Sequence, residues 1–556
     1  MSSNERSTQD SPSISEKAPE KTSGDVHVYA VDVDTAKLAE LGYKSEFKRE
    51  FSLIETCAFS FSIMGIVASI SSTLAFGLFN GGHVGFVWGW FIPSSFVGFV
   101  ALSMAELASS MPTSAGLYYF SAKLAPERHA PLASWITGWA NITGQVALVC
   151  SIDFTCAQMI TTAIAVSSDG ATVLSAGATY GILVAILIAH GIVCSAATKI
   201  LARLNLFYVV VNVGTTVAAI VALLVASGDN KVSTREAFTS FENNSGWANN
   251  GWALMLAFTS AMWTLTGYDS AAHISGNPSL ISLGSAKQIS FSEETSNAGR
   301  AAPIAILVGV GATASLGWLL LIATSFVVVS IPDLIGTTLP LPMGQVFLDV
   351  LGKRGMLAIW SFIIVGTMSA NQRDTGTLTT LQFVTGAAQG VDASRVVFAF
   401  ARDNALPGSR YWKKMNRYAV PGYAVWFVMF WSAILGLLGF SVAALTSLAG
   451  ASVIGLYTSY AAPIFLRITS GRDKLRPGPF SLGRWGVPIG VVAVSWVSFV
   501  VVFLVFPAGQ TVDAASMNYA VVIIGSVFIF ASLSWITSAR HWFRGPVRTV
   551  EDKASD

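Results

Sequence analysis

One apolar stretch of the sequence, Trp252–Ser275, carries side chains that can bind and release a proton. Asp269 and His273 are four residues apart, which places them on one face of a helix. Just before them, the segment Thr264-Leu-Thr-Gly267 brings in two β-branched residues and a glycine, which lower helix propensity. Because unpaired backbone groups and a carboxylate are costly in lipid, we expect this stretch to line a polar cavity inside the protein. A helix interrupted at mid-membrane is typical of a transport site.

A second interruption lies near the start of the chain. The first long apolar run, Phe51–Phe79, exceeds the roughly 20 residues that a bilayer needs, and Gly65 stands at the centre of its segment Ser62–Ser69. Taken alone, either run also fits a kinked helix whose glycine has no function. The recurrence of the pattern favours two functional breaks.

The composition places the chain among polytopic membrane proteins. Of 556 residues, 53% are hydrophobic and 12% are charged, whereas soluble domains have roughly 45 to 50% and about 25%. The net charge of +2 says little, because the location of the charges is what matters in such a protein. Four cysteines lie in apolar runs, so we expect buried packing residues and neither disulfides nor a zinc site; they are Cys57, Cys150, Cys156 and Cys194.

Three regions follow from the distribution of apolar residues. Residues 1–48 are rich in serine, lysine and glutamate and have no apolar core, so we expect a disordered cytoplasmic tail and no signal peptide. Residues 49–540 form the predicted transmembrane transporter domain, whose first helix serves as its own targeting signal. Residues 541–556 form a cytoplasmic C-terminal tail.

Twelve apolar runs are long enough to cross a bilayer. They are Phe51–Phe79, Val84–Leu107, Leu132–Ile164, Leu174–Val193, Leu204–Ala226, Trp252–Ser275, Pro303–Val329, Met356 to about Val391, Val420–Phe440, Ala443–Leu466, Val487–Phe506 and Tyr519–Ile536. The interruptions fall in runs one and six, five spans apart. We therefore predict an all-α polytopic membrane protein with two inverted five-helix repeats, broken helices 1 and 6, and two further helices at the C-terminal end.

The lysines and arginines predict the orientation, because cytoplasmic loops carry an excess of them. With the N-terminus inside, the inner side collects Lys44, Lys48, Arg49, Lys123, Arg128, Lys199, Arg203, Lys287, Arg300, the clusters 395–417 and 467–484, and Arg540, Arg544 and Arg548. The outer loops hold Lys231, Arg235, Lys353 and Arg354. Both termini are therefore expected in the cytoplasm. The sequon at Asn243 then lies outside and is a glycosylation candidate, whereas the sequon at Asn141 lies inside a span and should stay unmodified.

Five segments together resemble the amino acid-polyamine-organocation (APC) superfamily, and within it the fungal amino acid/choline transporter group that includes γ-aminobutyrate permeases. They are SIMGIVASI at 62–70, AELASSMPTSAGLYYF at 105–120, TGYDSAAHIS at 266–275, SEETSNAGRAAP at 292–303 and SRVVFAFARDNALP at 394–407. The resemblance covers about residues 43 to 540.

The resemblance implies a LeuT-like fold in which backbone groups around the two breaks hold the carboxylate and the amine of a substrate. The implied substrate-binding residues are Met64, Gly65, Ile66, Val67, Ala68 and Ser69 in the first break and Trp263, Thr264, Leu265, Thr266 and Gly267 in the second. By the same resemblance, Trp263 is a gate that closes over the substrate and Asp269 is an acid linked to proton-dependent gating. The helix termini at a break fit this role physically, because they offer free N–H and carbonyl groups.

The sequence departs from the pattern of the family in two respects. Some proton-coupled relatives have a lysine in the fifth helix in place of a sodium ion, but here the polar residue near that place is Asn212, which leaves the coupling ion open. In addition, residues 276–291 and 373–382 interrupt motifs that join naturally without them. Our hypothesis is that each segment is retained intron sequence or another gene-model error, with genuine inner-side insertions as the alternative.

Other polar residues in apolar runs have both functional and structural interpretations. Asp153 lies inside the third run, where a carboxylate costs about 2.5 kcal/mol or more, so it either carries a proton or substrate amine, or is a hydrogen-bonded structural acid. Glu106 is expected in a structural ion pair, and Glu293, Glu294 and Arg300 in an inner-loop charge network. His273 is either a proton partner of Asp269 or a vestibule histidine.

The predicted function is secondary active import of a small amino compound, γ-aminobutyrate or another amino acid, by proton symport at the plasma membrane. A choline or polyamine transporter of the same fold and a non-transporting nutrient receptor are the alternatives. A membrane enzyme is disfavoured, because the sequence has no histidines at metal-ligand spacing, no nucleophile with a nearby base and no phosphate-binding glycine loop. The expected partners are the substrate, a proton and the lipid bilayer, with no cofactor, metal or nucleic acid.

Overall fold

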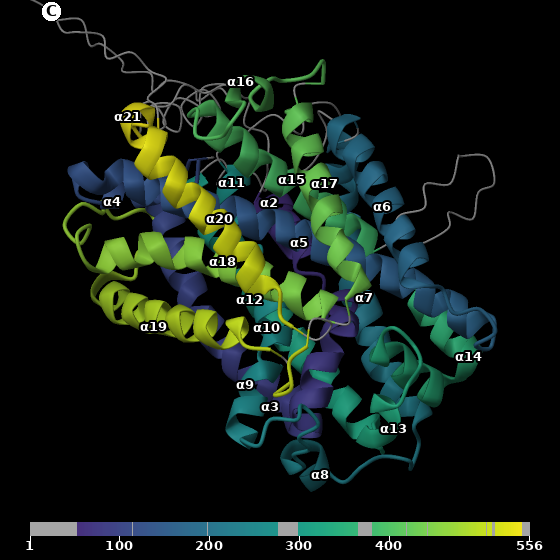
Figure 1. Cartoon of the computed structure of the whole chain (residues 1–556). Helices are drawn as coiled ribbons and strands as arrows, with labels where there is room; N and C mark the ends of the chain where they lie inside the picture. The colour runs from purple at the N-terminus through teal and green to yellow at the C-terminus, as the bar shows by residue number, and fades with distance from the viewer. Residues whose placement is uncertain are drawn as a thin grey trace, which may run out of the picture.

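A computed structural model of the chain describes residues 53–113, 115–196, 198–275, 298–364, 381–418, 420–441, 443–507, 509–513 and 517–546. The regular elements of these residues are all helices (Figure 1). Several expectations fall outside the described residues: the N-terminal tail, most of the C-terminal tail, Glu293 and Glu294, the segment 276–291 and all of 373–382 except its last two residues.

The first half of the chain begins with two helices that are separated by a short break. These are α2 (Leu53–Ile63) and α3 (Ile66–Ser110), and α3 bends sharply at Gly81 and Gly82, where Gly82 has a φ of 56°. The helices that follow are α4 (Leu117–Leu124), the 3-10 turn η1 (Glu127–His129), α5 (Ala130–Ser167), α6 (Ala176–Ala196), α7 (Thr198–Ala226), α8 (Thr234–Thr239), α9 (Asn250–Ala257), α10 (Thr259–Thr264) and α11 (Ser270–Ser275).

The second half consists of long helices and short helical turns. They are α12 (Ala298–Val327), α13 (Ile331–Ile335), α14 (Pro342–Ile364), α15 (Leu381–Arg402), α16 (Ser409–Trp412), α17 (Gly422–Leu435), η2 (Gly436–Phe440), α18 (Ala444–Ile468), η3 (Gly483–Trp485), α19 (Gly486–Val505), α20 (Ala520–Ser534), the π-helical turn η4 (Trp535–Ala539) and α21 (Arg540–Trp542).

The described residues contain nine helical segments that are long and apolar enough to cross a membrane. The first of them, Thr56–Ser110, contains two of the runs expected from the sequence, which meet at Gly81 and Gly82, where the backbone leaves the helical conformation. Most ends of the other segments lie within a few residues of the expected ones. Both breaks are present, since α2 ends before Gly65 and α10 ends before Gly267.

The eighth expected run differs most from its prediction. The helix α14 is interrupted at Gly352, which has a φ of 67°, so its second part begins close to the expected Met356, whereas α15 continues to Arg402, well past Val391. Arg395, which we placed on the inner side beyond the end of this run, lies within α15 and is 3% exposed. The prediction was wrong because it ended the helix where apolar residues become sparse, whereas polar side chains of α15 are buried against neighbouring helices.

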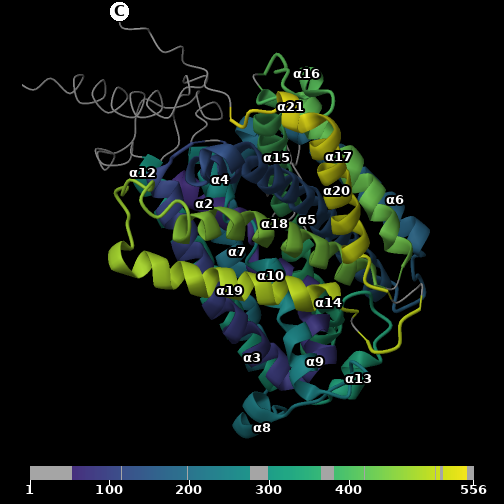
Figure 2. The same ribbon diagram turned by 60° about the vertical axis from the view of Figure 1, so that its left-hand side comes forward.

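The helices pack so that α5 lies at the centre, in contact with α18, α15 and α4, while α3 packs against α12, α9 and α10. In both views α8 and α13 lie at one end of the molecule, and α16 and α21 lie at the opposite end (Figures 1 and 2). The four cysteines form no disulfide, and Cys57 alone among them is partly exposed. The two helix breaks therefore lie within a bundle of long apolar helices.

Candidate functional site

The first helix break consists of Met64 and Gly65, between the end of α2 and the start of α3. Both residues are buried, as are the residues from Ile66 to Ser69 in the first turn of α3. The N–H of Ile66 donates to Oδ1 of Asn212 on α7 at 3.3 Å, and the N–H of Ser69 returns to the carbonyl of Gly65 at 3.2 Å. The break thus presents the start of a helix, with its positive dipole end, to the protein interior.

The second break runs from Leu265 to Asp269, between α10 and α11. Gly267 has a φ of 94°, a left-handed conformation that residues with a side chain rarely adopt. The residues expected to bind substrate here, Trp263, Thr264, Leu265, Thr266 and Gly267, are all buried. The backbone leaves the helix at this point because glycine tolerates the required conformation, and the end of α10 is left with carbonyl groups beyond the helical pattern.

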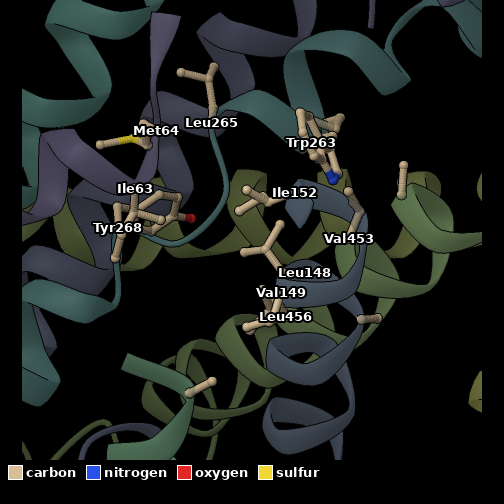
Figure 3. Packing of buried hydrophobic residues seen from close by; sticks show 14 of the residues in the cluster. Ile63, Met64, Leu148, Val149, Ile152, Trp263, Leu265, Tyr268, Val453 and Leu456 are labelled. Atoms are coloured by element: carbon tan, nitrogen blue, oxygen red, sulfur yellow. The ribbon is translucent and has the colours of Figure 1, made fainter. Parts of the chain in front are cut away.

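The two breaks lie against each other. A Cβ added to Gly267 would lie 2.5 Å from Cγ2 of Ile63, the last residue of α2. Figure 3 shows apolar side chains around them: Ile63, Met64, Leu148, Ile152, Leu265 and Tyr268. The start of α3, the ends of α2 and α10 and a group of apolar side chains therefore lie together in one place.

Polar side chains from α7 and α15 close the other side of the first break. Tyr208 and Thr385 share a hydrogen bond of 2.7 Å between their hydroxyls, and Nδ2 of Asn212 lies 3.3 Å from the hydroxyl of Tyr208. A Cβ on Gly65 would lie 2.8 Å from that hydroxyl, so the glycine is in close contact with the pair. The sequence singled out Asn212 but not Tyr208 or Thr385.

Trp263, the expected gate, is held against α5. Its indole N–H donates to Oγ of Ser151 at 2.9 Å, and the side chain is 2% exposed. The ring lies near Ile152 and Val453 in Figure 3. Trp263 is one residue from the end of α10, so a shift of this half-helix would carry the indole with it.

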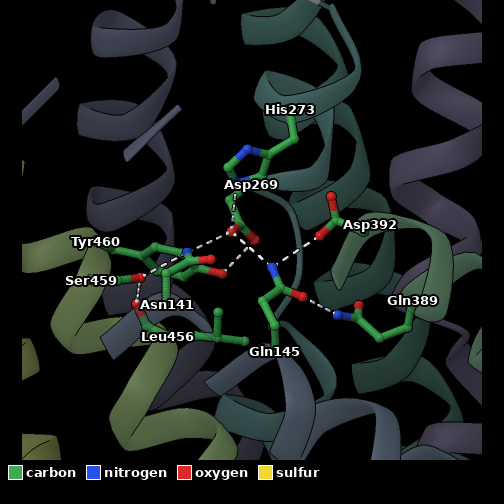
Figure 4. Close-up of polar contacts among 9 residues, drawn as sticks. All are labelled: Asn141, Gln145, Asp269, His273, Gln389, Asp392, Leu456, Ser459 and Tyr460. Atoms are coloured by element: carbon green, nitrogen blue, oxygen red, sulfur yellow. Dashed lines mark hydrogen bonds and ion pairs between the residues drawn. The ribbon is translucent and has the colours of Figure 1, made fainter. Parts of the chain in front are cut away.

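Asp269 accepts hydrogen bonds from two other helices, α18 and α5 (Figure 4). The hydroxyl of Tyr460 on α18 donates to Oδ1 at 2.6 Å, and the amides of Asn141 and Gln145 on α5 donate to Oδ2 at 3.4 and 3.3 Å. His273 approaches Oδ2 at 3.5 Å from the next turn. His273 therefore lies close enough to Asp269 for the first of its two interpretations, and the carboxylate is fully buried.

A second buried carboxylate, Asp392 of α15, lies in the same cluster, and the sequence analysis missed it. Nε2 of Gln145 donates to Oδ2 of Asp392 at 3.0 Å as well as to Asp269, and Nε2 of Gln389 donates to the side-chain oxygen Oε1 of Gln145. The acids and amides come from three separate helices. In the sequence alone, the one signal for Asp392 is that an acidic residue lies inside a helix.

Asp153 occupies a different environment, in which it pairs with a histidine. Oδ2 of Asp153 lies 3.0 Å from Nδ1 of His190 on α6, and both side chains are fully buried. Gly386 of α15 packs against this pair, because a Cβ there would overlap Oδ1 of Asp153. Asp153 was a candidate from the sequence alone, whereas His190 was not.

The remaining candidates have structural partners. Glu106 accepts the N–H of Leu482 at 3.1 Å and lies 3.8 Å from Nε of Arg467, as expected of a structural ion pair. Asn141 is buried inside α5, whereas Asn243 lies half-buried in the connection between α8 and α9. Among the described residues, no group of three His, Cys, Asp or Glu side chains is placed to hold a metal ion.

Comparisons with known proteins agree with this architecture. The model of the family described as amino acid permease matches residues 51–528. The amino-acid permease BAT1 homolog of Oryza sativa subsp. japonica is 36% identical, with 94% of this chain and 96% of the relative covered. The amino-acid permease BAT1 of Arabidopsis thaliana is 34% identical over 94% of this chain and 98% of its own length. The GABA-specific permease of Saccharomyces cerevisiae is 33% identical over 93% and 86%.

These relatives are permeases and not enzymes, and they align over nearly the whole of this chain. The two broken helices lie within the matched residues, so the features that make up the site are part of the aligned region. The chain belongs to the amino acid permease family and is a multi-helix integral membrane transport protein.

Proposed function

We propose that this permease is a secondary active importer of a small amino compound, with γ-aminobutyrate or another amino acid as substrate and a proton as the coupling ion. The observation that carries the proposal is the close contact of the two helix breaks at Ile63 and Gly267. A gap in one helix is compatible with a simple kink. Two gaps in contact bring opposite helix ends together at one place in the membrane interior, as binding of a zwitterion requires.

The backbone supports the two charged ends of such a substrate. The first turn of α3 presents a helix N-terminus with about half a positive charge, where the N–H groups of Val67 and Ala68 lie between those of Ile66 and Ser69, which already have acceptors, and this end favours a carboxylate. The ends of α2 and α10 offer carbonyl groups, which favour an ammonium group. The apolar side chains of Ile63, Leu148 and Ile152 suit the methylene carbons between the two charges.

The proposal includes the arrangement of the chain in the membrane: twelve spans, two inverted five-helix repeats with two C-terminal helices, cytoplasmic termini and a plasma membrane location. The placement of α8 and α16 at opposite ends of the molecule supports the orientation (Figure 1). The segment around α16 is basic, with Arg410, Lys413, Lys414 and Arg417, as expected for a cytoplasmic face. Alternating access then moves the helices that carry the two breaks relative to α5 and α15.

Proton coupling is the proposed energy source. Asp269 is the first candidate carrier, because it lies in the second break, next to Tyr268, and its buried carboxylate accepts hydrogen bonds from neutral donors. Asp153, paired with His190, is the second candidate. Each positive charge that enters with the substrate gains about 2.3 kcal/mol per 100 mV of membrane potential.

An uptake panel in proteoliposomes tests the proposal. Purified protein is reconstituted, and uptake of labelled γ-aminobutyrate, neutral and basic amino acids, choline and putrescine is measured with an imposed inward proton gradient, with an inward sodium gradient, and with neither. The expected result is accumulation of one or more amino acids that the proton gradient increases. Accumulation of choline or putrescine alone would reject the substrate class, and accumulation that depends on sodium would reject both proton carriers.

A variant separates Asp269 from Asp153. Asp269→Asn keeps the size of the side chain but cannot release a proton, so we expect it to lose concentrative, pH-dependent uptake. If that uptake were preserved, Asp269 would not be the carrier. A protein that binds amino acids but never accumulates them in any gradient would be a receptor instead.

A further inference from the structure

Two fully buried carboxylates, Asp269 and Asp392, share one amide donor. Nε2 of Gln145 lies 3.3 Å from Oδ2 of Asp269 and 3.0 Å from Oδ2 of Asp392 (Figure 4). Neither side chain has measurable exposure to solvent. Gln145 thus uses its amide nitrogen to connect an acid in the second helix break with an acid in α15.

The two acids differ in the number of donors around them. Asp269 accepts hydrogen bonds from Tyr460, Asn141 and Gln145. It also lies 3.5 Å from His273. For Asp392, Gln145 is the one donor that the described residues provide, and its Oδ1 is buried without a hydrogen-bond partner among them. When one oxygen of a carboxyl group is buried without a hydrogen-bond partner, the ionised form costs far more free energy than the protonated form in the same place.

Compensating positive charge is scarce in this cluster. Among the described residues, His273 is the one basic group within ion-pair distance of either acid, and it approaches Asp269. Arg395 lies three residues after Asp392 on α15, but its two terminal nitrogens make no hydrogen bond within the described part of the chain. The other titratable groups near the acids are Tyr268, Tyr457 and Tyr460, and the Arg395 side chain interacts electrostatically with both Asp392 and Cys194. The surroundings can therefore support one negative charge more readily than two.

We propose that Asp269 and Asp392 form a two-carboxylate site that holds one exchangeable proton, that Asp392 carries it in this conformation, and that this proton is the one coupled to transport. The inference rests on the proposed proton symport and assigns its carrier to a pair instead of to Asp269 alone. When the proton leaves, both carboxylates are ionised and repel each other across Gln145, which favours separation of α11 from α15.

Gln389 connects this pair with the helix breaks. Its side-chain nitrogen Nε2 donates to the side-chain oxygen Oε1 of Gln145, which orients the Gln145 amide so that Nε2, the shared donor, faces the two acids. Its Oε1 is buried without a hydrogen-bond partner among the described residues and would lie 3.3 Å from a Cβ on Gly267. An unpaired acceptor that faces the second break can respond to a substrate there, and its movement would change the position of Gln145 between the two acids.

The experiment compares proton-driven uptake with simple exchange in the same proteoliposomes. Asp392→Asn mimics the protonated acid, so exchange of labelled for unlabelled substrate should stay within about threefold of wild type. Stimulation of uptake by an inward proton gradient should fall by about tenfold or more, together with the substrate-dependent acidification of the lumen that a trapped pH dye reports. Asp392→Glu keeps a titratable group and should retain both signals. Asp349→Asn, at an exposed acid of α14, is the matched control and should behave as wild type.

The outcomes separate this inference from the proposed function. Proton-driven accumulation at the wild-type level in Asp392→Asn would overturn the two-carboxylate site and leave proton symport intact. Absence of proton stimulation in the wild-type protein would overturn both. If Asp392→Asn does not fold, Gln145→Leu decides, because loss of the shared donor should move the pH of half-maximal uptake by about one unit or more; an unchanged pH profile would contradict the inference.

Discussion

The hydroxyl of Tyr460 lies 2.6 Å from Oδ1 of Asp269 and donates a hydrogen bond to it from α18. This contact joins the broken helix that carries Asp269 to a helix that packs against α5. Hydrogen bonds to an ionised group contribute about 1.5 to 3 kcal/mol. The phenol therefore stabilises the deprotonated form of the acid, which our account requires on release of the coupling proton.

Tyr460→Phe removes this donor and should make deprotonation of the acid pair harder. The protonated form then persists to higher pH, so we expect the pH of half-maximal uptake to rise by about one unit, the equivalent of about 1.4 kcal/mol. Uptake is measured from pH 4 to 8 at constant membrane potential. Tyr180→Phe, which removes a 3.1 Å hydrogen bond to the carbonyl of Ala433, is the control and should leave the profile unchanged. A profile that does not move in Tyr460→Phe would show that this contact is structural.

Trp263→Leu should weaken the apparent affinity for substrate by about tenfold, or about 1.4 kcal/mol, and slow transport. The reason is the loss of a large ring that excludes water and attracts a cation near the second break. Concentration dependence of uptake and surface expression are the measurements. Ser151→Ala removes the hydrogen-bond partner of the indole and keeps the ring, so it should cost about 1 kcal/mol or less. Equal losses in both variants would assign the effect to packing.

Asn212→Leu leaves the N–H of Ile66 without its acceptor at the start of α3. An unsatisfied buried donor costs about 1 to 3 kcal/mol, so the thermal stability of the purified protein should fall. Bound substrate should restore part of this stability, because its carboxylate can accept a hydrogen bond from the free N–H. Asn80→Leu, at a buried asparagine that bonds within its own helix, is the control and should show no such rescue. Equal rescue in both variants would argue against a substrate carboxylate at Ile66.

Local residue types were sufficient to predict both helix breaks and most span ends. Gly65 and Gly267 stand out because a glycine inside an apolar run weakens the helix whatever surrounds it. The burial of Asp269 follows equally from its position in such a run. These features depend on neighbours in sequence, which a single chain displays directly.

The polar cluster could not be predicted in the same way. Gln145, Asp392 and Tyr460 come from three helices that are far apart in sequence, so their meeting depends on how the helices pack. The end of the eighth run was placed too early, at about Val391, because polar residues follow there, whereas helix packing buries Arg395 within α15. Side chains that act together across helices leave no spacing pattern in the sequence.

Asn243 should carry an oligosaccharide, since our topology places the connection between α8 and α9 outside the cell. Its amide nitrogen donates to the carbonyl of Trp247 and to Asn250, and a sugar would replace one of its two hydrogens. A glycosidase should therefore shift the mobility of the protein, and Asn243→Gln should abolish the shift. Asn141, 2% exposed within α5, should stay unmodified. Accessibility of this loop to a protease only from the cytoplasmic side would reverse the orientation.

Gly65 provides the most direct test of a substrate site at the helix breaks. A side chain there meets the hydroxyls of Tyr208 and Thr385 and fills the space through which a carboxylate reaches the backbone, whereas a Cβ on Gly98 of α3 would meet nothing within 4 Å. Both glycines are replaced by valine, and the two purified proteins are compared by size-exclusion chromatography.

The decisive measurement is equilibrium binding of labelled γ-aminobutyrate, or of the amino compound that the uptake panel identifies, to wild type, Gly65→Val and Gly98→Val. Our account predicts binding to wild type and to Gly98→Val with affinities that agree within about threefold, and no measurable binding to monodisperse Gly65→Val. Wild-type affinity in monodisperse Gly65→Val would contradict a substrate site at the contact between the two breaks.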